Sequence, residues 1–254
     1  MKNHLAIYSI LGIYLYCQKD QDAMRLLAVL LLVLMLMGLV YGQNTAADWS
    51  KNGFDYSNQG IFDLANKCFD KALALEPNNT EILTAKCYVL YSQDKYDEAI
   101  KAIDEATRLD PNDYTIWYVK GHALAAQKKY DEAIKVYDEA IKLNPEYPYT
   151  RIDKGKALAA QGKYERAINI CDDIIKQNPD ITDAWRTKGD ILVAQGKYDE
   201  AIDAYDEALL IDPNWSVVWH NKGNALKALG RFSEADAAFA KAGGVGAAAE
   251  AKML

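Results

Sequence analysis

Between residues 182 and 215 the apolar side chains fall into two stripes that have the spacing of helices. The first stripe begins at Trp185 and stops at Gly196, which interrupts the helical pattern. The second starts beside Asp199, where negative charge suits the amino-terminal end of a helix, and stops before Pro213. The stretch predicts a helical hairpin. Neither short helix can bury its stripe alone, so the hairpin needs neighbours.

The hairpin pattern recurs with a period of 34 residues. Five of the six prolines occupy one place in this period, at Pro77, Pro111, Pro145, Pro179 and Pro213. A small residue recurs in each first helix, at Gly53, Cys87, Gly121, Gly155, Gly189 and Gly223. Alanine recurs in each second helix, at Ala65, Ala99, Ala133, Ala167, Ala201 and Ala235. Small residues at fixed places let helix backbones approach closely. The predicted repeats run 46–79, 80–113, 114–147, 148–181, 182–215 and 216–249.

One set of positions carries a family resemblance: Trp185, Gly189, Leu192, Tyr198, Ala201, Tyr205, Ala208 and Pro213. Their pattern resembles the tetratricopeptide repeat, and six tandem matches cover residues 46–249. The resemblance implies an all-α solenoid at residues 43–249, a right-handed superhelix of antiparallel helix pairs. It also implies a concave groove, lined by the first helices, that holds peptides or partner helices, and it implies no catalysis.

One position departs from the resemblance. The family usually carries leucine just before the small residue of the first helix. This chain carries Asn52 there in the first repeat and lysine afterwards, at Lys86, Lys120, Lys154, Lys188 and Lys222. Because lysine can bury its stem and keep its ammonium group in water, the expected fold is unchanged.

The chain is expected to begin with a targeting segment. Residues 26–40 form a charge-free apolar run behind Arg25, which is the size of a signal-peptide core and shorter than the ~20 residues that cross a bilayer comfortably. Residues 1–42 are interpreted as a signal peptide cut ahead of Gln43 or as a retained membrane anchor, with Met24 a possible true start. A membrane hairpin of two apolar runs, and a buried or artefactual segment, stay open. Both main interpretations export the repeats, to a secreted or membrane-anchored location.

The predicted repeats are acidic, which limits the class of partner. The formal net charge is −7, and residues 1–42 carry three basic and two acidic side chains, so the repeats hold about −8. An acidic solenoid is a poor binder of nucleic-acid phosphates. No spacing suggests a metal site, and no nucleophile stands beside a base. The sequence therefore predicts neither a cofactor nor an enzyme.

Two covalent modifications are candidates. Cys68 and Cys87 are expected at similar heights on adjacent helices, which makes them a possible disulfide in an oxidising compartment. Asn78 and Asn214 begin acceptor sequons in the turns between repeats and are possible glycosylation sites. The competing interpretation is that Pro-Asn is simply the turn that this repeat favours, and it holds unless the chain is exported.

The candidate ligand site is the concave groove that the resemblance implies. The family's concave positions give peptide-groove candidates at Phe54, Tyr88, Tyr91, Tyr118, His122, Tyr149, Lys156, Arg186, Asp190, His220, Asn221, Asn224 and Lys227. Tyrosine is a frequent binding hot spot. The competing interpretation is that, in a chain with 17 tyrosines, they only line a solvent-filled groove that binds no ligand. Members that clamp carboxylates use lysine, asparagine and arginine at positions that here hold Ser50, Phe54, Ala85, Thr115 and Val119. Recognition of chaperone tails is therefore not expected.

Three functions remain. The main hypothesis is an exported interaction scaffold that binds a peptide or helical segment of a partner protein in the groove. The alternative is a structural or self-associating envelope spacer without a specific groove ligand. A fragment of a repeat-containing enzyme has the least support.

The solenoid is expected to end within the sixth repeat. Repeats two to five carry isoleucine one residue after the first alanine of the second helix, and the sixth carries Asp236. These isoleucines are Ile100, Ile134, Ile168 and Ile202, and they are expected to pack toward the next repeat or the core. Since a terminal repeat needs a more polar outer face, the sixth repeat is the expected cap. Residues 246–254 should be at most a short, loosely attached helix, with 250–254 a tail.

Overall fold

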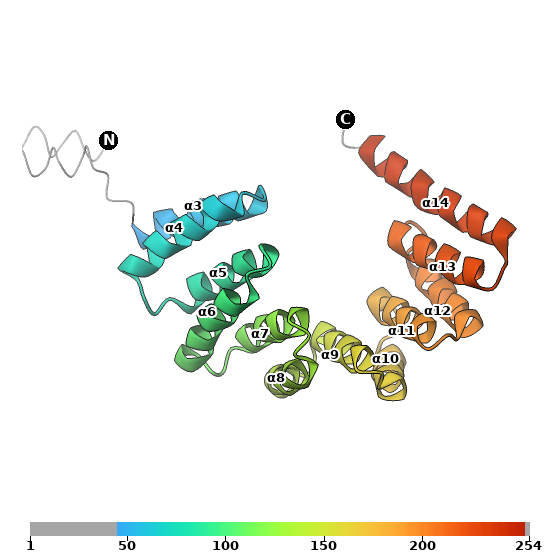
Figure 1. Cartoon of the computed structure of the whole chain (residues 1–254), viewed down its shortest axis with the longest axis horizontal. Helices are drawn as coiled ribbons and strands as arrows, with labels where there is room; N and C mark the ends of the chain where they lie inside the picture. The colour runs from blue at the N-terminus through green and yellow to red at the C-terminus, as the bar shows by residue number, and fades with distance from the viewer. Residues whose placement is uncertain (1–44, 252–254) are drawn as a thin grey trace, which may run out of the picture.

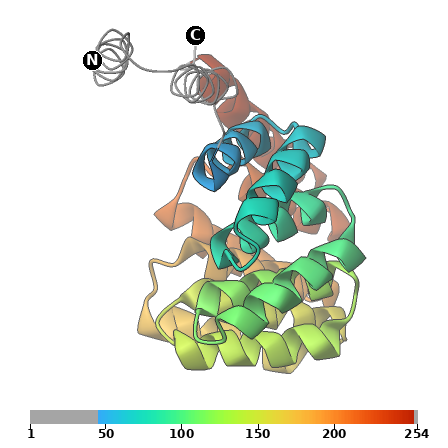
Figure 2. The same cartoon turned by 90° about the vertical axis from the view of Figure 1, so that its left-hand side faces the viewer.

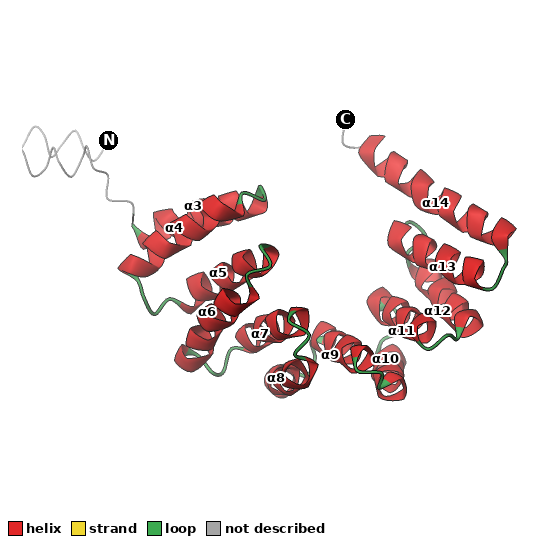
Figure 3. Cartoon of the chain, in the orientation of Figure 1, coloured by secondary structure: helices red, strands yellow, loops and turns green. Residues whose placement is uncertain are grey.

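The computed structural model describes residues 45–251, with side chains described up to residue 243. The predicted signal peptide or anchor and the possible start at Met24 lie outside the described residues. Twelve helices and no strands fill the described range (Figure 3). They are α3 (Ala46–Asn58), α4 (Phe62–Leu75), α5 (Thr80–Ser92), α6 (Tyr96–Leu109), α7 (Tyr114–Ala126), α8 (Tyr130–Leu143), α9 (Pro148–Ala160), α10 (Tyr164–Gln177), α11 (Thr182–Ala194), α12 (Tyr198–Ile211), α13 (Ser216–Ala228) and α14 (Phe232–Ala251).

The helices pack as consecutive antiparallel pairs along an arc (Figures 1 and 2). Each helix packs against its neighbours in sequence, and the first helices of successive pairs also contact one another, as α9 and α11 do. Figure 1 shows α5, α7, α9 and α11 on the inner side of the arc and their partners α6, α8 and α10 on the outer side. The predicted all-α solenoid is confirmed. None of the described helices is long and apolar enough to cross a bilayer.

The turn inside each pair uses a left-handed residue at the same place in every repeat. The residue with positive φ is glycine in four repeats and Asp94 or Lys128 in the other two: Gly60, Asp94, Lys128, Gly162, Gly196 and Gly230. This conformation lets the backbone reverse between the helices, and glycine adopts it without a steric penalty.

The small residue of the first helix makes room for a ring from the second helix. A β-carbon placed at Gly53, Gly121, Gly189 or Gly223 would stand 2.3–2.5 Å from the nearest ring atom. The rings belong to Phe69, Tyr137, Tyr205 and Phe239, each sixteen residues after its glycine. Glycine thus lets the two helices close on an aromatic wedge.

The predicted isoleucines join successive repeats. Ile134 packs against the core of its own repeat and against the next core cluster, around Leu158. Ile168 likewise packs against that cluster and the following one, around Leu192. The expectation that this position packs toward the next repeat or the core is confirmed. Asp236, its counterpart in the last repeat, is exposed.

The carboxyl-terminal residues differ from the expectation. The chain forms no separate short helix after residue 246, because α14 continues without a break through the glycine pair at 243–244 to Ala251. Two consecutive glycines disfavour a helix without forbidding it, and the alanines that follow have the highest helix propensity.

The lysines that depart from the family pattern form a ladder of ion pairs between repeats. Each lysine contacts an aspartate sixteen residues earlier, on the second helix of the preceding repeat. The pairs are Lys86–Asp70, Lys120–Asp104, Lys154–Asp138, Lys188–Asp172 and Lys222–Asp206. The lysine side chains are mostly covered and the carboxylates about half exposed. The ammonium group of each lysine is therefore paired with a carboxylate, whereas the sequence predicted that it would be solvated.

Candidate peptide-binding groove

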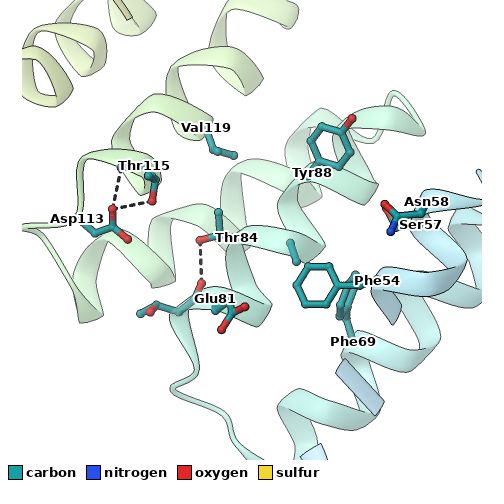
Figure 4. A pocket seen from close by; sticks show the side chains of 12 residues that line it. Phe54, Ser57, Asn58, Phe69, Glu81, Thr84, Tyr88, Asp113, Thr115 and Val119 are labelled. Carbon is teal, nitrogen blue, oxygen red and sulfur yellow. Dashed lines mark hydrogen bonds between the residues drawn. The ribbon is translucent and has the colours of Figure 1, made fainter. Parts of the chain in front are cut away.

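The concave side of the first three repeats contains an open pocket of about 400 Å³ (Figure 4). Helices α3, α5 and α7 supply most of its lining, and Phe69 of α4 reaches it from behind. Its lining residues are Phe54, Ser57, Asn58, Phe69, Thr80, Glu81, Thr84, Ala85, Tyr88, Asp113, Thr115 and Val119. Of the predicted groove residues, the pocket brings Phe54 and Tyr88 together.

The apolar part of the pocket is preorganised. The rings of Phe54 and Phe69 meet edge to face with their centroids 5.3 Å apart, and Phe69 is fully buried. Tyr88 leaves 58% of its surface exposed at the edge of the pocket. A fixed aromatic floor beside an exposed tyrosine suits an apolar side chain of a ligand.

The middle of the groove is a polar cluster around Asp153 of α9. Oδ2 of Asp153 accepts a hydrogen bond from the Tyr118 hydroxyl at 3.0 Å, and Oδ1 accepts one from Lys156 Nζ at 2.8 Å. Nε2 of His122 also lies 3.0 Å from Oδ2, an ion pair when the imidazole is protonated, although the contact lacks hydrogen-bond alignment. The side chain of Asp153 is only 11% exposed. Three predicted groove residues therefore converge on one buried carboxylate.

Burial and the neighbouring cations have opposing effects on the pKa of Asp153. Burial by itself raises the pKa of the carboxyl group, but His122 and Lys156 outweigh it and lower the pKa of Asp153 to about 2. The pKa of Tyr118 is raised, first by burial and then by the negative charge of Asp153. At neutral pH Asp153 is therefore an anion that its neighbours already satisfy.

A second polar cluster occupies the carboxyl-terminal half, around Asp190. Its Oδ1 accepts hydrogen bonds from the Tyr205 hydroxyl at 2.7 Å and from Asn221 Nδ2 at 2.9 Å. Its Oδ2 accepts one from Arg186 Nη1 at 2.8 Å, and Arg186 also binds Asp183. The bonds from Tyr205 and Asn221 tie α11 to α12 and α13, while Arg186 binds the aspartates of its own helix.

Of the other predicted residues, Tyr149 adjoins the Asp153 cluster through Tyr147, which packs edge to face on Tyr118 with ring centroids 5.6 Å apart, and the rest lie outside these groups. Tyr91 packs against Tyr96, and Tyr149 packs against Tyr147 with ring centroids 5.3 Å apart. His220, Asn224 and Lys227 are exposed on α13, where His220 packs beside Phe239. The predicted set is thus three groups and some scattered residues, not one continuous site.

Several residues of these groups were not predicted as ligand contacts. Asp153 lies in α9 between the groove candidates Tyr149 and Lys156, and Tyr147 precedes α9 as its N-cap. Glu81 and Asp113 lie at the starts of α5 and α7, where an acidic residue is usually explained by the helix dipole. The two do not share a repeat register, because they lie 32 residues apart in a 34-residue period, so no periodic signal identified them.

The two candidate cysteines are buried, and the two candidate glycosylation sites are exposed. Cys68 and Cys87 are buried free thiols that are not joined in this structure, and burial raises the pKa of Cys87 to about 12. Asn78 and Asn214 are exposed in the turns before α5 and α13. No group of three or more potential metal ligands occurs among the described residues. Pairing and glycosylation stay predictions.

Comparison with known proteins identifies the repeat. Two models described as "Tetratricopeptide repeat" match residues 84–148 and 124–191, and one described as "TPR repeat" matches 189–230. Together they span more than half of the chain. No curated protein matches the chain in sequence.

Solved structures share the fold at low sequence identity. A thermophilic TPR protein of Thermus thermophilus is 19% identical with a TM-score of 0.61, covering 72% of this chain and 99% of its own. YrrB, described as a TPR protein with an unusual peptide-binding site, is 21% identical with a TM-score of 0.54, covering 74% and 96%. PilW, described as a type IV pilus biogenesis factor, is 16% identical with a TM-score of 0.66, covering 76% and 90%.

Tetratricopeptide repeat proteins are generally non-enzymatic scaffolds that bind protein partners. On its sequence period, its helix pairs and these matches, the chain belongs to the tetratricopeptide repeat family.

Proposed function

We propose that the chain is an exported interaction scaffold that binds an extended segment of a partner protein in its concave groove. The pocket beside Phe54 and Tyr88 anchors one apolar side chain of that segment. The repeats are carried outside the cytoplasm by the apolar segment at residues 26–40, either as secreted protein or at a membrane.

One observation carries the proposal. The pocket crosses three successive repeats and combines a rigid Phe54–Phe69 floor with the exposed ring of Tyr88. An exposed aromatic beside a concave apolar surface is the usual composition of a binding hot spot. YrrB, which shares the fold, is described as having a peptide-binding site, which supports the assignment as an analogy only.

The two polar clusters serve as walls of the groove in this proposal. The hydrogen-bonding capacity of Asp153 and Asp190 is already used within the protein. A ligand that competed for these carboxylates would leave buried polar groups without partners, which costs binding energy. The affinity is therefore concentrated at the Tyr88 end of the groove.

A peptide selection tests the proposal. A displayed library of random peptides is selected on the full chain, and the affinity of an enriched peptide is measured for the parent protein and for Tyr88→Ala. Loss of a hot-spot aromatic should weaken binding about tenfold or more. The control is Leu210→Ala, which removes another exposed apolar side chain, 74% exposed, from the second helix α12.

Two results contradict the proposal. One is a selection that enriches no peptide. The other is a set of enriched peptides whose affinity Tyr88→Ala leaves unchanged or that Leu210→Ala weakens equally.

A further inference from the structure

The rim of the Tyr88 pocket is acidic. Glu81 and Asp113 are its two charged lining residues, and no lysine or arginine lines it. Figure 4 shows their side chains on the same side of the pocket, below and beside Thr84, with Tyr88 and Asn58 on the other side. A ligand that crosses the pocket therefore meets negative charge on one side of its apolar anchor.

The acidic character continues into an adjoining hollow. A second pocket of about 380 Å³ lies between α3 and the start of α5 and shares Phe54 and Glu81 with the first. It adds the carboxylates of Asp55 and Glu76, and Lys51 is its one cation. The two pockets together have four carboxylates and one lysine around a phenylalanine.

These carboxylates differ in how far the protein satisfies them. Asp113 accepts hydrogen bonds from the backbone amide and hydroxyl of Thr115, as the N-cap of α7, and Glu76 accepts one from Asn79. The side chains of Glu81 and Asp55 make no hydrogen bond or ion pair with any described residue, and both are exposed. Their charge is open to a ligand, in contrast to the satisfied carboxylates of Asp153 and Asp190.

We infer that the groove selects a cationic segment: an extended peptide with one large apolar or aromatic side chain flanked by lysine or arginine. The inference rests on the proposed function and specifies its ligand. The anchor enters between Phe54 and Tyr88, and the basic side chains reach Glu81 and Asp113 at the rim and Asp55 in the adjoining hollow. Exposed charge pairs add modest affinity, but they steer association and exclude acidic competitors.

Three short peptides of equal length, acetylated and amidated, serve as probes. Each has a central phenylalanine, flanked by lysines in the first, by serines in the second and by glutamates in the third. Their affinities for the full chain are measured at ionic strengths of about 0.05 M and about 0.5 M, which shorten the screening length severalfold. The lysine peptide should bind best and lose most affinity in salt. The glutamate peptide should bind worst.

Charge-neutralising variants locate the effect. Glu81→Gln and Asp55→Asn should each weaken the lysine peptide about twofold to fivefold, the range expected for one exposed charge pair. They should leave the serine peptide unchanged. Asp113→Asn keeps an N-cap acceptor for α7 while removing the charge, so it serves as a third variant with the fold preserved. The control is Asp203→Asn, which neutralises an exposed carboxylate of α12 outside the groove.

The outcomes separate this inference from the proposed function. Equal binding of the lysine and serine peptides, or an unchanged lysine-peptide affinity in Glu81→Gln, overturns the cationic preference. If the serine peptide still binds and loses affinity in Tyr88→Ala, the proposed function stands without it. Failure of all three peptides counts against both.

Discussion

The ring of Tyr205 lies so close over Gly189 that a β-carbon at this glycine would stand 2.5 Å from Cε1 of the ring. Tyr205 is almost fully buried, and its hydroxyl donates a hydrogen bond to Asp190 of α11. The ring therefore cannot swing away without breaking that bond. The repeat is locked by glycine and tyrosine together.

The first prediction compares two glycines at the same repeat position. Gly189→Ala should overpack the contact with Tyr205 and lower the free energy of unfolding by about 1–3 kcal/mol. Gly155→Ala should be neutral or stabilising by about 0.5–1 kcal/mol, because alanine favours a helix and the nearest atom would lie at an ordinary 3.6 Å. Gly155 has this room because Cys171 stands where the four other repeats with this glycine carry a ring. Urea unfolding of both variants measures the difference in their free energies of unfolding. Equal losses of stability would contradict the claim that Gly189 makes room for the ring of Tyr205.

The second prediction concerns the lysine ladder. The Lys188–Asp172 pair, 2.6 Å between Nζ and Oδ1, is half exposed on its carboxylate side and should contribute only about 0.2–1 kcal/mol. A double-mutant cycle of Lys188→Met and Asp172→Asn measures this coupling energy. The coupling should fall at high salt because the carboxylate is accessible to solvent. A salt-independent coupling well above this range would mean that the ladder is a main source of stability.

The third prediction concerns pH. The pKa of Asp153 is lowered to about 2 in the folded chain, whereas an unfolded aspartate titrates near ~3.9. The unfolded chain therefore binds the proton first as pH falls, and the stabilisation is complete above about pH 4 and is lost between about pH 4 and 2. Asp153→Asn should be least stable relative to the parent near neutral pH, and the gap should narrow by roughly 2 kcal/mol by pH 2. Chemical unfolding of both proteins across this pH range measures the difference in their free energies of unfolding. A difference that widens as pH falls would contradict the prediction.

The fourth prediction concerns the end of the solenoid. Asp236→Ile should expose, on the last repeat, the apolar side chain that joins repeats elsewhere, and should promote association of the chain in sedimentation experiments. The matched control is Asp203→Asn, an exposed carboxylate on α12 of the preceding repeat.

Deleting residues 244–254 should leave a soluble monomer of nearly unchanged stability. Aggregation or unfolding of that deletion variant would show that the continuation of α14 is the true cap.

The fifth prediction concerns export. Protein recovered from its native host should begin near Gln43, or else it should be found in the membrane fraction with residues 26–40 retained. Amino-terminal sequencing and fractionation distinguish these outcomes. Full-length protein free in the cytoplasm would contradict both.

The sequence by itself determined the fold and its frame. Helical periodicity and a 34-residue repeat placed the hairpin at 182–215, and α11 and α12 begin and end within it. It also identified the positions that join repeats, since Ile134 and Asp236 behave as their spacing predicted. Repeats are predictable in this way because each unit contacts mainly its neighbours, so local pattern and tertiary packing follow one period.

Only the tertiary structure decided which polar residues are free to bind. The sequence placed Arg186, Asp190 and Tyr88 on the same concave face and could not rank them. The structure shows that Arg186 and Asp190 bond to each other and that Asp190 also bonds to neighbouring helices, while Tyr88 stays exposed beside the Phe54 pocket. The physical reason is that hydrogen bonds between side chains on different helices depend on distances of tenths of an ångström. A periodic pattern fixes the face of a residue, but packing sets those distances.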